Sequence, residues 1–259
     1  MTTYIKRLTR LAKAYATAEA EVIAAFFKRP HTPTDHLRWL KAQGFKEFSA
    51  IKPIIDALTA LYPKIDRGTS RHDYAELTEK LADETKHARL VMDLIQEISG
   101  KPTTPRDLTW LPEDRKLARV RARYSQSYAT LLHGSGKVNS REIKRRDEDL
   151  ERAAITLTEG GGGALYLVCS KLKKRGIEAK IAQAFDEILR DEVGHKDSGG
   201  RALGGQIEND ADCQRAAEII SAVCGQRLRM RNEQFDFPLS KIRLAELNQR
   251  ALAALHSRK

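Results

Sequence analysis

A short pattern of acidic and imidazole side chains occurs twice in this chain of 259 residues. It reads DETKH at residues 83–87 and DEVGH at residues 191–195. In each copy a Glu and a His are three residues apart, so on a helix they share one face about one turn apart. That spacing lets a carboxylate and an imidazole reach the same metal ion. Because a carboxylate on an apolar helix face is costly to bury, ligation of a cation would compensate for its charge.

The alternative explanation is a pair of solvated Glu–His contacts on helix surfaces. A single Glu-x-x-His is weak as a signal, because such pairs are frequent on exposed helices. Here both copies lie in the middle of an expected helix, and both have an Asp directly before the Glu. The duplication therefore favours metal binding over two unrelated surface pairs.

A helical bundle that binds two metals in this way needs one further Glu from each of two other helices. Glu159 is the expected ligand from one of them. It lies about as far before Gly176 as Glu192 lies after it, so an antiparallel hairpin would place the two at one height.

The Glu from the other helix is left open between two positions. Glu47, which lies 37 residues before Glu84 on an apolar stripe of the neighbouring segment, is preferred. Glu19 also lies on an apolar stripe, and it would supply the ligand if residues 30–70 were an excursion from the bundle. Asp56 is a weaker candidate, since it is close to the helix end expected at Pro63.

The elements that must position these residues all have a helical period. Apolar residues recur every three or four positions, and no sustained alternation typical of strands occurs. We expect Gly44 and Pro53 to kink or break the second helix. The expected helices cover residues 4–28, 35–62, 71–98, 113–132, 140–174, 178–197, 210–230 and 239–256. The prediction is an all-α protein with a single domain over residues 1–259, a bundle core at about 35–200 and a C-terminal helical extension at 206–259.

The order of these residues resembles the ferritin-like di-iron carboxylate superfamily, as a pattern over residues 35–200. The Asp before each Glu-x-x-His is similar to the motif of the di-iron oxygenases and of the small subunit of ribonucleotide reductase. Those relatives often carry Arg just before the His, where this chain has Lys86 and Gly194. The resemblance implies a ferritin-like four-helix bundle with additional helices at both ends.

The same resemblance implies two iron ions, with manganese as the alternative, and O₂ as co-substrate. It also implies that Asp83 and Asp191 hydrogen-bond metal-bound histidines. The implied ligands are Glu47, Glu84 and His87 for one metal and Glu159, Glu192 and His195 for the other.

Four glycines, Gly160–Gly163, directly follow Glu159. Inside a helix each costs about 1 kcal/mol relative to Ala, so the run needs a reason. Close helix packing and a helix break are two explanations, and open space for a substrate is the third. The predicted substrate pocket is formed by Gly160, Gly162, Gly163 and Tyr166, although a Tyr at that spacing is more often a core residue.

The function favoured by this pattern is a di-iron, O₂-activating oxidase or monooxygenase that acts on a small or carrier-bound organic molecule. The alternatives are an iron-storage protein, a manganese catalase or peroxidase, and a tRNA-modifying di-iron hydroxylase. The net charge of +11 would repel iron cations, which disfavours storage. The same charge favours an acidic electron-transfer or carrier protein as partner. RNA is a weaker candidate because aromatic residues make up only 6% of the chain.

The three cysteines, Cys169, Cys213 and Cys224, have no metal-ligand spacing, so we expect buried free thiols in a reducing compartment. No secretory signal is expected, because the N-terminal segment lacks an apolar stretch. No transmembrane helix fits the sequence either, so we expect a cytoplasmic protein with no membrane partner. A homodimer is also expected.

Overall fold

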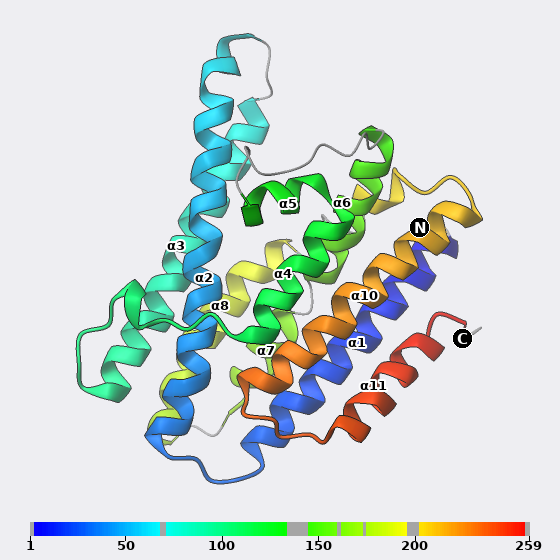
Figure 1. Ribbon diagram of the computed structural model, residues 1–259. Helices are drawn as coiled ribbons and strands as arrows, with labels where there is room; N and C mark the ends of the chain where they lie inside the picture. The colour runs from blue at the N-terminus through cyan, green and yellow to red at the C-terminus, as the bar shows by residue number, and fades with distance from the viewer. Residues whose placement is uncertain are drawn as a thin grey trace. The chain divides into compact units, whose positions relative to one another are not determined.

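Every regular element in the described part of the computed structural model is a helix, which confirms the all-α prediction (Figure 1). The structure describes residues 3–67, 71–133, 145–159, 162–172, 175–195 and 202–256. None of the helices formed by these residues has the length and apolar character needed to cross a lipid bilayer.

The chain divides into two compact units, and each is described by itself. Unit 1 comprises Met1–Pro30, Leu111–Leu172 and Phe185–Lys259, and unit 2 comprises His31–Trp110 and Lys173–Ala184. The single ferritin-like domain expected from the sequence stays a prediction.

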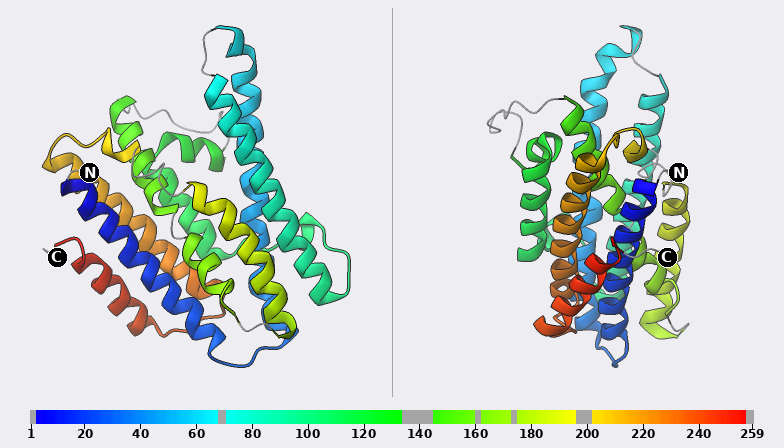
Figure 2. Two further views of the ribbon diagram at one scale, coloured as in Figure 1. Left: turned by 180° about the vertical axis from the view of Figure 1, so that it is seen from behind. Right: turned by 90° about the vertical axis from the view of Figure 1, so that its right-hand side faces the viewer.

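Unit 2 is built on two long helices, α2 (Pro33–Leu61) and α3 (Arg71–Ser99), which pack side by side (Figures 1 and 2). A short 3₁₀ helix, η1 (Tyr62–Arg67), follows α2, and another, η2 (Pro105–Asp107), follows α3. A capping box between Thr32 and Asp35 fixes the start of α2, because each residue's side chain accepts from the other's backbone N–H. The first part of α8 (Gly176–His195) also belongs to this unit.

Helix α2 runs through Gly44 and Pro53 without interruption, so the predicted break is wrong. The glycine has a packing role instead. A Cβ atom at Gly44 would lie 3.0 Å from Cδ2 of Leu108 and 3.3 Å from Cγ1 of Val91 on α3. The missing side chain therefore lets α3 and the segment after it approach α2 closely.

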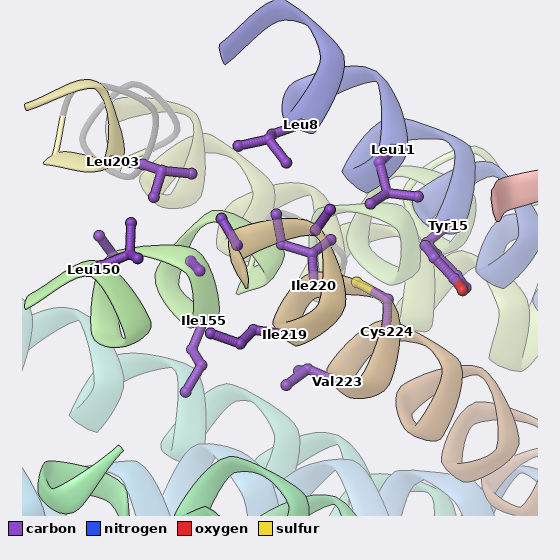
Figure 3. Close-up of a cluster of buried hydrophobic side chains, with 14 of the residues drawn as sticks. Leu8, Leu11, Tyr15, Leu150, Ile155, Leu203, Ile219, Ile220, Val223 and Cys224 are labelled. Atoms are coloured by element: carbon purple, nitrogen blue, oxygen red, sulfur yellow. The ribbon is translucent and has the colours of Figure 1, made fainter. Parts of the chain in front are cut away.

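Unit 1 is centred on α10 (Asp210–Gln234), most of which is buried. It packs against α1 (Thr3–Phe27), α4 (Pro112–Tyr124) and α6 (Arg145–Glu159), while α11 (Lys241–Ala253) lies along α1. Figure 3 shows the apolar core between α1, α6 and α10. Its members include Leu8, Leu11, Tyr15, Ile155, Ile219, Ile220 and Val223. The C-terminal segment that we predicted as an extension thus contributes the core helix of this unit.

Two of the predicted helices are each divided in two. Residues 113–132 form α4 and α5 (Gln126–His133), which meet at the extended residue Ser125. The carboxylate of Glu148 accepts hydrogen bonds from the backbone N–H groups of Gln126 and Ser127 at the start of α5. The predicted helix over 140–174 is divided into α6, which ends at Glu159, and α7 (Gly162–Cys169).

Candidate metal centre

Three side chains with metal-ligand atoms meet between α2 and α3 in unit 2. Glu47 comes from α2, and Glu84 and His87 come from α3. One ligand atom from each of the three lies within 4.8 Å of the other two, which is close enough for a single metal ion. Glu47 and His87 are buried, with exposed fractions of 4% and 1%, and Glu84 is half-buried.

Close packing of the two helices brings these residues together. Gly44 lies one turn before Glu47 on α2, and Val91 lies one turn after His87 on α3. Because Gly44 has no side chain, the two helix backbones approach each other next to the cluster. The glycine therefore supports the short distance between Glu47 and His87.

A glutamine that the sequence analysis did not single out holds Glu47 in place. The Nε2 atom of Gln43 donates a hydrogen bond of 2.6 Å to Oε1 of Glu47. Both side chains are buried, so this bond fixes the carboxylate where water does not compete. The signal available in the sequence was the four-residue spacing, which places Gln43 and Glu47 on one helix face.

Two carboxylates and one imidazole form a mixed oxygen and nitrogen donor set. Such sets suit Fe(II) and Mn(II), and zinc accepts the same ligand types. Two neighbouring carboxylates repel each other in a partly buried site, and a divalent cation between them removes this repulsion. Among the described residues, this is the one group of three side chains with ligand atoms at metal-binding distance.

The second copy of the motif lies on α8. Asp191 and Glu192 are half-buried there, and Glu159 is the last residue of α6. The side chains of Glu159 and His195 lie outside the described residues. The second ligand set therefore stays a prediction, as does the role of the two Asp residues, of which Asp83 is also half-buried.

Glu19, the competing first-helix carboxylate, has a different environment. It is fully buried, and one of its carboxylate oxygens lies 3.5 Å from Nε of the buried Arg231. An ion pair with a guanidinium accounts for the burial of this carboxylate without a metal. Glu47 is the candidate that the structure brings to Glu84 and His87.

The glycine run coincides with a helix boundary. Gly160 lies outside the described residues, and α7 begins at Gly162 and continues through Gly163. The choice among the three explanations for the glycines depends on residues 160 and 161, which lie outside the described residues. Tyr166 is buried, with its ring centroid 6.0 Å from that of Phe185, as expected of a core residue. The predicted pocket stays a prediction.

The cysteines are free and buried, as predicted. Burial raises the pKa of the Cys224 thiol to about 12, and it raises the pKa of Cys169 further still. A thiol with a raised pKa carries little thiolate near neutral pH, so neither residue has the character of a nucleophile or a metal ligand.

Comparison with known proteins gives no match: no protein family, no curated protein and no solved structure is similar to this chain. The residues that bear on function are therefore those of the cluster, two of which belong to the duplicated motif.

Proposed function

We propose that this chain is a di-iron carboxylate protein with a ferritin-like bundle, which activates O₂ to oxidise an organic substrate. The observation that carries the proposal is the cluster of Glu47, Glu84 and His87 between two packed helices. It supports the proposal because this cluster contains the first copy of a motif that the chain carries twice. The donor set also fits iron.

In this proposal one metal would be held by Glu47, Glu84 and His87, and the second copy of the motif would supply ligands for a second metal. Glu84 is half-buried, so its carboxylate would be accessible to an incoming ion. Gln43 holds Glu47 in one orientation through its hydrogen bond. When bound, a pair of Fe(II) ions supplies electrons for the reduction of O₂. The buried positions of Glu47 and His87 exclude bulk water from that side of the site.

The direct test is anaerobic titration of the metal-free protein with Fe(II), followed by O₂ addition. We expect about two iron ions per chain, one for each copy of the motif. Glu84→Ala and Glu192→Ala should each lose about one equivalent or more, because each variant removes a ligand carboxylate from one of the two sites. Glu79→Ala is the matched control, since Glu79 is an exposed carboxylate on α3.

Oxygen uptake and the iron count then separate the candidate functions. Consumption of O₂ with about two irons per chain supports an oxidase or monooxygenase. Uptake of many irons per chain would show storage instead, and activity with Mn(II) and peroxide alone would show a catalase. If wild-type protein binds no metal, or if both variants keep their full metal content, the proposal is wrong.

A further inference from the structure

A buried arginine on α10 contacts the last turn of α6, directly before the residue that we assign to the second metal. Arg227 has an exposed fraction of 3%, and Thr158 one of 1%. The guanidinium Nη1 donates a hydrogen bond to the backbone carbonyl of Thr158, and Nη2 donates to Oγ1 of Thr158 at 2.8 Å. One side chain therefore holds both the backbone and the side chain of this residue.

The contact lies in the last turn of α6 as the structure describes it. In an uninterrupted helix each carbonyl accepts from the N–H four residues later, and the last carbonyls of a helix lose those donors. Helix α6 ends at Glu159, one residue after Thr158. Arg227 supplies a donor to one of these carbonyls, and its positive charge is favourable at the negative end of the helix dipole.

Apolar packing fixes the position of the arginine. Ile155 of α6 lies next to Ile219 of α10 in the apolar core (Figure 3). The same core contains Val223, which is one turn before Arg227. The hydroxyl of Thr158 also donates to the carbonyl of Ile155 at 2.6 Å. The same helix pair therefore provides both an apolar contact and, one turn further along, a polar contact at the end of α6.

The guanidinium of Arg227 makes this contact in a buried position. A guanidinium stays protonated, and its burial is costly unless an anion lies nearby. The buried Arg231 has Glu19 at 3.5 Å. Both hydrogen bonds that Arg227 makes to described residues go to oxygens of Thr158, which carry no charge. Two directed hydrogen bonds to one residue therefore restrict the position of the last turn of α6.

We propose that Arg227 is a positioning residue for the second metal: it fixes the last turn of α6, and with it the backbone of Glu159. This inference rests on the proposed function, because it needs Glu159 as a ligand. It predicts that the arginine acts on one of the two metal sites and leaves the cluster of Glu47, Glu84 and His87 unaffected.

The experiment compares Co(II) and Fe(II) titrations of wild-type protein and Arg227→Met, with circular dichroism to report the helical content. We expect the variant to bind the second metal about ten- to a hundred-fold more weakly while the first is retained. Arg227→Lys should restore part of this affinity, because an ammonium can donate to the carbonyl of Thr158 but cannot form the forked contact. The absorption spectrum of bound Co(II) gives a second measure of the altered site.

Arg215→Met is the matched control. Arg215 also connects α10 to α6, through a hydrogen bond of 2.5 Å from its Nη2 to Oε1 of Glu151, but it does so away from the end of α6. This variant should bind both metals as wild type does. Equal loss in both Met variants would mean that any weakening of the α10–α6 contact has the same effect, and the inference would be overturned.

Two further results bear on the inference. If Arg227→Met binds both metals with wild-type affinity, the inference is wrong while the proposed function stands. If wild-type protein binds no second metal, the proposed function fails first, so the two failures are distinguishable. Should Arg227→Met not fold, Arg227→Lys is titrated in its place. Weaker binding of the second metal alone would support the inference, and wild-type affinity for both metals would overturn it.

Discussion

At the scale of single residues, the environment of Glu47 is the feature that most favours a metal site. A buried carboxylate is stable when hydrogen bonds or a cation compensate for its lost hydration. Gln43 provides one such bond to Oε1, and the ligand atoms of Glu84 and His87 lie within 4.8 Å of those of Glu47. The same glutamine limits the rotation of the carboxylate, so it acts on metal affinity without being a ligand.

Replacing Gln43 by Leu should therefore weaken metal binding at the cluster by about ten- to a hundred-fold, as for other residues that orient metal ligands. Titration with Co(II), followed by absorbance, measures the change. Gln214→Leu is the control, because Gln214 makes a similar contact to Glu218 on the exposed side of α10. Unchanged affinity in Gln43→Leu would show that the hydrogen bond has no part in positioning Glu47.

At the scale of elements, the close approach of α2 and α3 depends on Gly44. Leu at this position would overfill the contact with Leu108 and Val91. We expect Gly44→Leu to lower the free energy of unfolding by about 1–3 kcal/mol, because overpacked cores must shift their backbones. The same shift should reduce metal affinity, since Glu47 and His87 lie one turn from the contact.

Urea unfolding and Co(II) titration test this expectation together. Gly204→Leu serves as control, because a Cβ at Gly204 would meet its nearest neighbour, Cγ1 of Ile5, only at 3.9 Å. A Gly44→Leu protein with wild-type stability and metal affinity would refute the packing role of this glycine. We expect Gly44→Ala to change stability and metal affinity less than Gly44→Leu does. A single methyl group needs smaller shifts of the neighbouring side chains, and Ala has a higher helix propensity than Gly.

At the scale of the whole molecule, burial is distributed unevenly along the chain. Most residues in the second half of α10 are buried, whereas the described residues of α3 before His87 are exposed or half-buried. Local opening costs least where few apolar contacts must be broken. Unit 1 therefore contains a well-packed central helix, α10, whereas the first part of α3 in unit 2 is largely accessible to solvent.

Hydrogen–deuterium exchange should reflect this distribution. We expect peptides from α10 to exchange most slowly, and peptides covering residues 71–81 to exchange far faster. Addition of Fe(II) under anaerobic conditions should slow exchange around Glu84 and His87, because metal binding stabilises the folded form of their helix. Equal protection of residues 71–81 and α10 would contradict the first expectation, and no response to metal would contradict the second.

The sequence by itself determined the helical class, the end of α3 at Gly100 and the duplicated motif. Helical period, capping and the spacing of Glu84 and His87 depend on neighbours within a few residues, so a linear pattern contains them. Gly100 has a positive φ of 68°, as expected of a glycine that ends a helix. The buried positions of Leu8, Leu11 and Tyr15 follow from the same local periodicity.

Only the tertiary structure decided which long-range partners these helices have. Glu47 and Glu19 both lie on buried helix faces, and the sequence supported only a preference for Glu47 because many helices with similar stripes can pack together. The structure sets Glu47 beside His87 and Glu19 beside Arg231. Burial beside a fixed charge depends on contacts between residues far apart in the chain, and local patterns carry no record of those contacts.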